Sequence, residues 1–86
     1  MEKINLNKLY KEAVAARIAA EKTKAEFFVE KEMIPELVEA AKNGESRKIL
    51  YIPGELKIAF VLEAIKEKVE YTEVKQDDRM LAFYWG

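Results

Sequence analysis

The stretch that decides the fold runs from Asn5 to Asn43 and reads NLNKLYKEAVAARIAAEKTKAEFFVEKEMIPELVEAAKN. Nearly all of it is typical of helix, and its one helix breaker is Pro35. At about 1.5 Å per residue, such a helix spans about 58 Å. A compact chain of 86 residues has a radius of gyration near 12 Å, and so a diameter of about 31 Å. The helix must therefore break, overhang the rest of the fold, or lie against another copy.

Two apolar stripes follow this helix. The first advances by alternating steps of four and three, as in a heptad seam, and contains Leu9, Ala13, Ala16, Ala20, Thr23, Phe27, Glu30, Ile34, Leu37 and Ala41. The second runs beside it and contains Tyr10, Val14, Ile18, Ala25, Phe28 and Val29. A helix with two apolar flanks has two surfaces to cover. We expect the chain's own sheet to cover one flank and a second subunit to cover the other.

The predicted oligomer interface uses the seam, where small alanines let a partner helix approach closely. Its residues are Leu9, Ala13, Ala16, Ala20, Phe27 and Ile34. Arg17 lies beside the seam, and two interpretations of it stay open. It either pairs with a glutamate of a partner helix or extends its charge into solvent.

Two residues mark irregularities at the far end of the helix. Pro35 removes a backbone donor, so it either kinks the helix or begins a new one. Asn43-Gly44 is a strong stop signal, because Gly44 adopts the left-handed conformation at no steric cost.

The remaining elements predict a small sheet. Residues 48–52 are predicted as a strand, 55–69 as a second helix, and 71–75 and 80–85 as two strands joined by a tight turn. The last strand is apolar on both faces, which places it in the centre. We therefore predict an α+β fold: a long kinked N-terminal helix over residues 1–44, then a β-α-β-β unit over 45–86. Its three-stranded antiparallel sheet has the order 1-3-2, and the whole chain is one domain.

The composition argues against an enzyme. The chain has no histidine and no cysteine, so the usual general base, thiol nucleophile and zinc ligands are missing. Ser46, the sole serine, lacks a conventional activator. We expect no catalytic residues, no cofactor and no metal. Asp77-Asp78 is explained more simply as a turn than as a cation site.

Charge and cysteine content also bound the location and the partners. Fifteen basic and sixteen acidic residues are interleaved, which argues against nucleic acid and anionic lipid as partners. No apolar run is long enough for a membrane span or a signal peptide. The absence of cysteine is typical of a reducing cytoplasm, which is the predicted location.

The sharpest candidate surface combines arginine, lysine and aromatic side chains, namely Arg47, Lys48, Tyr51, Arg79, Tyr84 and Trp85. These residue types suit a planar anionic ligand such as a nucleotide, through charge-assisted hydrogen bonds and stacking. The same types are enriched at protein–protein hot spots. A third interpretation makes Tyr84 and Trp85 ordinary sheet core, with solvated cations at the strand ends.

Three short segments carry a family resemblance: Ala40-Ala41-Lys42-Asn43-Gly44, Tyr71-Thr72-Glu73-Val74 and Phe83-Tyr84-Trp85. In this layout the chain resembles small α+β proteins encoded by bacteriophages and prophages of Gram-positive bacteria. It departs from them at Glu70, where such proteins often carry glycine. The resemblance implies a phage-encoded protein that acts in the host cytoplasm by binding, including as an inhibitor of bacterial defence.

Three functions follow as expectations. The first is a non-enzymatic homo-oligomeric binding protein, a dimer or larger, that acts on a host protein. The second is a sponge that sequesters a small anionic signalling nucleotide. The third is a virion or scaffold component, for which the rod-like helix is the argument.

Overall fold

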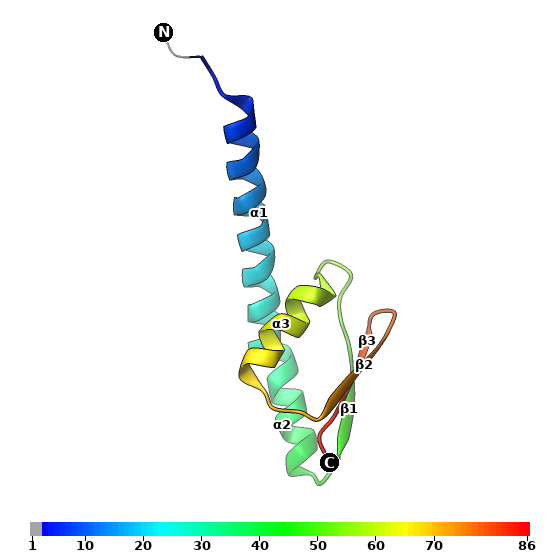
Figure 1. The fold of residues 1–86 in the computed structure, drawn as a ribbon. Coiled ribbons are helices and arrows are strands. Elements are labelled where there is room, and N and C mark those ends of the chain that lie inside the picture. The colour runs from blue at the N-terminus through cyan, green and yellow to red at the C-terminus, as the bar shows by residue number, and fades with distance from the viewer. Residues whose placement is uncertain (1–2) are drawn as a thin grey trace.

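The computed structural model describes residues 3–86 and confirms the α+β fold (Figure 1). A long helix leads into a β-α-β-β unit whose sheet has the order β1-β3-β2. The elements are α1 (Leu6–Phe28), a π-helical turn η1 (Val29–Met33), α2 (Ile34–Lys42), β1 (Arg47–Tyr51), α3 (Ile58–Lys68), β2 (Glu73–Asp77) and β3 (Met80–Tyr84). Within residues 3–86, none of the helices has the length and apolar character that a membrane crossing requires.

The long helix runs from Leu6 to Lys42, within the predicted span of residues 1–44, of which residues 1 and 2 lie outside the described part of the chain. Asn5 caps it, its side chain accepting a hydrogen bond of 3.0 Å from the backbone nitrogen of Lys8. Gly44 ends it with a φ of +82°, in the left-handed region. Between these ends the helix overhangs the sheet, so the molecule measures 68 × 21 × 19 Å. Its radius of gyration is 17.3 Å, against the value near 12 Å of a compact chain.

The helix passes Pro35 without a break because the turn before the proline is π-helical. The backbone nitrogen of Ile34 donates to the oxygen of Val29, five residues back. This wider turn leaves room for the Pro35 ring. It also holds one extra residue, which rotates all later side chains by about 100° around the axis. The predicted irregularity is therefore a π turn within a continuous helix.

The rotation aligns the buried face of the long helix. Ala25 precedes the π turn, Val29 and Met33 are its first and last residues, and Leu37 follows it. All four side chains are buried. Steps of four residues drift by about 40° each on a regular α-helix, so this face would spiral away from the sheet. The π turn cancels that drift and keeps the face on the core.

The sheet follows the predicted topology, with small shifts in boundaries. β3 is central and pairs antiparallel with both neighbours, so that Leu81 lies opposite Leu50 of β1. Asp78 and Arg79 form the two-residue turn between β2 and β3, and Asp78 has a φ of +54°. α3 begins at Ile58 rather than at residue 55, because Leu56 first closes a turn onto the carbonyl of Pro53.

One face of the sheet is covered and the other is open. The end of α1, η1, α2 and α3 lie on the covered side (Figure 1). There the fully buried side chains meet: Val29, Met33, Ile52, Val61, Ile65, Leu81 and Phe83. On the open face Ile49, Tyr51 and Met80 are 50%, 62% and 44% exposed. No helix of residues 3–86 covers them.

Two ion pairs fasten α3 to the long helix, one at each end of α3. Lys57, just before α3, places its Nζ 2.9 Å from Oε2 of Glu21. Lys68, at the end of α3, pairs with Glu30 of η1. Between them the ring of Phe60 lies under the Nζ atoms of Lys22 and Lys57, each 5.6 Å from its centroid.

The Glu30–Lys68 pair predicts a specific pH dependence of stability. The hydrogen bond from Lys68 lowers the pKa of Glu30 below its ordinary 4.5 and raises the pKa of Lys68 above 10.5. A carboxylate with a lowered pKa stabilises the fold above pH 4.5, and this contribution is lost as the pH falls through the folded-state pKa. The Lys68 contribution is complete below pH 10.5 and is lost as the pH rises through its own folded-state pKa.

We therefore expect Glu30→Gln to lower the urea midpoint at neutral pH, by a modest amount because both side chains are solvent-exposed. The difference from the native chain should close as the pH falls below the folded-state pKa of Glu30. Urea titrations at several pH values check this. A difference that stays constant in acid would show that the substitution acts through something other than charge.

Candidate binding surfaces

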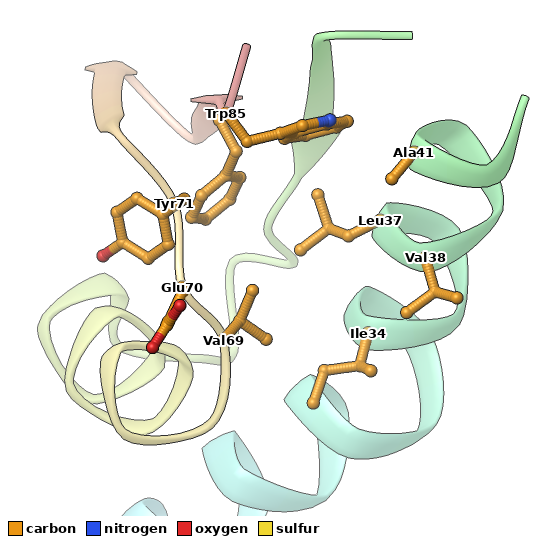
Figure 2. Close-up of a pocket in the computed structure, with 9 residues that line it drawn as sticks. Ile34, Leu37, Val38, Ala41, Val69, Glu70, Tyr71 and Trp85 are labelled. Atoms are coloured by element: carbon orange, nitrogen blue, oxygen red, sulfur yellow. The ribbon is translucent and has the colours of Figure 1, made fainter. Parts of the chain in front are cut away.

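The clearest concave site is an apolar pocket between α2 and the β-α-β-β unit (Figure 2). It holds about 190 Å³ and opens to solvent. α2 supplies one wall with Ile34, Leu37, Val38 and Ala41. The opposite wall comes from the segment after α3, from β3 and from the residue that follows β3, and consists of Val69, Glu70, Tyr71, Phe83 and Trp85.

Internal contacts hold the aromatic wall of this pocket in place. The Trp85 indole nitrogen donates a 2.8 Å hydrogen bond to the carbonyl of Glu45. The ring of Tyr71 meets Phe83 edge-on, with centroids 5.2 Å apart and planes at 81°. The pocket is therefore preformed rather than a gap between loose side chains.

The chemistry of the pocket suits an apolar group. Its lining contains one ionisable carboxylate, Glu70, and no arginine, lysine, serine or threonine. The other polar groups of the lining are the Tyr71 hydroxyl and the Trp85 indole nitrogen, and the latter is bonded to the Glu45 carbonyl. The site can hold an aliphatic or aromatic side chain, and Glu70 sets the charge at its edge.

The three segments that carry the phage resemblance meet here. Ala41, Tyr71, Phe83 and Trp85 come from those segments and line the same pocket. Sequence reasoning singled out Trp85 but missed the pocket, because its walls come from parts of the chain more than 25 residues apart. Val69 and Tyr71 were predicted as the end of a helix and the start of a strand, whereas the structure places both in the connection between α3 and β2.

The structure distributes the six residues of the predicted ligand surface over different places. Arg47 and Tyr84 are direct cross-strand partners on the open face of the sheet, and Tyr51 lies further along the same face. Lys48 points to the opposite, inner face, where it lines a shallow hollow with Glu36, Glu39 and Glu45. Trp85 lines the apolar pocket. The six residues therefore do not form one site.

Arg79 has an internal role. Its Nε donates a hydrogen bond of 2.7 Å to the carbonyl oxygen of Ile52. One Nη donates a hydrogen bond of 2.6 Å to the carbonyl oxygen of Pro53 and another to the carbonyl oxygen of Leu56. Its own carbonyl accepts a 2.8 Å bond from the nitrogen of Ile52. Arg79 thus ties the β2–β3 turn to the segment that leads into α3, which leaves its guanidinium engaged with the chain itself.

The predicted oligomer interface is largely open. Leu9, Ala13, Ala16, Ala20 and Phe27 are all exposed, Leu9 by 52% and Phe27 by 62%. Ile34, counted on the same seam, instead packs against the chain's own core. The π turn explains the difference, because it rotates every residue after it away from the seam.

Two further observations concern metal ligands and known proteins. Among residues 3–86, no three acidic side chains lie close enough together to hold a metal ion. Comparison with protein families, with curated proteins and with solved structures found no match. The surfaces described above are therefore the basis for a functional proposal.

Proposed function

We propose that this chain is a non-enzymatic, phage-encoded binding protein that assembles with itself through α1 and holds a host protein in its apolar pocket. An inhibitor of bacterial defence in the host cytoplasm is the functional class we favour. One observation carries the binding role: a preformed pocket of about 190 Å³ whose lining side chains are aliphatic or aromatic except for Glu70. Pockets of this kind accept the apolar anchors that dominate protein–protein affinity.

Size and charge favour a protein side chain over a nucleotide in this pocket. Sites for drug-sized ligands usually hold about 300–1,000 Å³, which is more than this pocket offers. An anionic ligand would also approach the Glu70 carboxylate with no cation in the lining to offset it. A leucine or phenylalanine of a partner meets neither obstacle.

One observation on the open face of the sheet favours the alternative function, a nucleotide sponge. Arg47 lies across from Tyr84 there, and Lys75 Nζ is 5.5 Å from the centroid of the Tyr84 ring. Thermal-shift measurements with cyclic and linear nucleotides test this second candidate. A shift that disappears in Arg47→Gln would favour the sponge over a host-protein partner.

The virion or scaffold alternative is supported by the elongated shape, 68 Å in its longest dimension. Purified phage particles provide the test. Detection of the chain in them at stoichiometric amounts would favour a structural role, whereas its absence from particles and presence in infected cells would favour the binding role.

Ala41→Glu is expected to weaken host-protein binding. The substitution puts a carboxylate at an exposed alanine on the pocket wall, where it would have to be desolvated by an apolar anchor. Ala59→Glu is the matched control, because Ala59 is also an exposed helical alanine but lies in α3 outside the pocket lining. We expect at least a tenfold loss of binding for Ala41→Glu, about 1.4 kcal/mol or more, and none for Ala59→Glu.

Capture from host lysate, followed by titration of the recovered protein, measures this difference. Equal capture by the native chain and both variants would contradict a pocket-based partner. Unfolding curves of the two variants check that each remains folded, since both positions are exposed and should change stability by no more than about 0.5 kcal/mol.

A further inference from the structure

We infer that the exposed part of α1 pairs with α1 of a second copy as a parallel, in-register, two-stranded coiled coil. This rests on the self-assembly in the proposed function and adds its orientation and register. The evidence comes from where the seam faces and from the charges that flank it. The experiments separate failure of this orientation from failure of assembly itself.

The seam of α1 lies on the side that the chain's own fold leaves free. Ala25 is buried against the core and Phe28 is half-buried there, whereas Phe27 between them is 62% exposed. Ala13, Ala16, Ala20 and Thr23 follow the same exposed side. A second helix can therefore approach this side, and at its C-terminal end Thr23 and Phe27 border an open hollow whose far side is formed by Glu55 and Leu56.

The large seam residues lie at the two ends of the exposed stretch. Leu6 and Leu9 are 75% and 52% exposed near the start of α1, and Phe27 is exposed near its end. The three alanines between them allow two helices to approach closely. Beyond Phe27 the seam stops, because Glu30 pairs with Lys68 and the π turn rotates Ile34 to the core. The contact thus spans about three heptads.

The charges beside the seam differ in sign between the two flanks. One flank carries Glu12 and Glu26, and the other carries Arg17, Lys24 and Lys31, at heptad spacing. All five are exposed, and among residues 3–86 none of them forms an ion pair. Glu26 and Lys31 also lie within electrostatic range of Lys68 and Glu30, respectively, whereas Glu12 and Arg17 lie on the overhanging part of α1.

The sign pattern selects a parallel arrangement. In a parallel coiled coil each flank faces the opposite flank of the partner, five residues further along. Glu12 then faces Arg17 of the second copy, and Glu26 faces its Lys31. In an antiparallel pair each flank faces itself, so glutamates would meet glutamates and the basic side chains would meet one another. Like charges repel, and the antiparallel pair is disfavoured.

Disulfide crosslinking tests the orientation directly, because the chain has no cysteine of its own. Leu9→Cys and Thr23→Cys lie at equivalent heptad positions, fourteen residues apart. In the parallel register each cysteine meets its own copy, at a Cα separation within the roughly 4.4–6.8 Å that a disulfide needs. We expect both variants to form covalent dimers under mild oxidation. Lys11→Cys, off the seam, is the matched control and should stay monomeric.

A second crosslinking experiment tests the antiparallel arrangement. A mixture of Leu9→Cys and Phe27→Cys forms the mixed disulfide only if the helices run antiparallel. That product, or failure of either Leu9→Cys or Thr23→Cys to link with itself, would overturn the parallel arrangement. Light scattering of the native chain at the same concentration distinguishes a wrong orientation from a failure to assemble. A monomer would overturn assembly through α1 and would leave the proposed binding role of the pocket unaffected.

Charge reversal gives a second, independent readout. Arg17→Glu places two repulsive pairs in a parallel dimer and should raise its dissociation constant about fivefold to tenfold. Adding Glu12→Arg to the same chain restores the opposite charges and should restore the native constant. In an antiparallel dimer Arg17→Glu would tighten association, because its flank is otherwise wholly basic. Analytical ultracentrifugation of the three chains measures the direction of change.

Discussion

Replacing Arg79 with methionine is expected to destabilise the protein by about 3–5 kcal/mol, because hydrogen bonds to a charged group contribute about 1.5–3 kcal/mol each. The guanidinium bonds three backbone carbonyls, those of Ile52, Pro53 and Leu56. Methionine keeps the length of the side chain but leaves these part-buried carbonyls without their donor. Native domains have a free energy of unfolding of about 5–15 kcal/mol, so this loss would be a large fraction of the total stability.

Arg79→Lys is the matched control for charge. An ammonium group retains the positive charge but cannot donate in the planar geometry that reaches three carbonyls at once. We expect about half of the methionine effect, measured as the shift in free energy of unfolding from urea titrations. If Arg79→Met were as stable as the native chain, its guanidinium would be free for a ligand, and the predicted role in anion binding would regain support.

Deletion of Glu32 is expected to destabilise the fold by about 3 kcal/mol or more. The residue lies in the π turn and is exposed, so its own side chain contributes little burial. Removing it restores a regular helical repeat and rotates Met33 and Leu37 by about 100° relative to the core. Each of these side chains is buried, and exposing one costs about 1.5–3 kcal/mol.

Two controls isolate the rotation from the deletion as such. Deletion of Lys11 also removes one exposed helical residue, but only overhanging residues lie before it, so the core should keep its stability. Pro35→Ala keeps the residue count and should change the free energy of unfolding by less than about 1 kcal/mol. A Glu32 deletion as stable as the Lys11 deletion would show that the helix phase is not fixed by the core.

Local signals were enough to predict most of the fold. Asn5 and Gly44 mark the ends of the helix through capping chemistry, which depends only on neighbouring residues. The position of β3 followed from its residues being apolar on both faces, a pattern that only a central strand needs here. The π turn escaped prediction, because the apolar spacing was counted on a regular helix, and Ile34 was placed on the seam as a result.

The candidate site was harder to predict because it depends on distant contacts. From the sequence, Arg79 is predicted to be a ligand-binding cation in a polar turn. Only its hydrogen bonds to the carbonyls of Ile52, Pro53 and Leu56 show its internal role. These partners lie 23 to 27 residues away in the sequence. The apolar pocket is likewise created by packing, since α2, the segment after α3 and Trp85 meet only in the folded chain.

The overhanging helix also changes how the molecule moves through water. Its radius of gyration of 17.3 Å makes a single copy of this 10.0 kDa chain drag like a larger sphere. A monomer will therefore elute early from a sizing column and tumble slowly about its short axes, mimicking a globular dimer. Mass must be taken from scattered light or sedimentation equilibrium, which do not depend on shape.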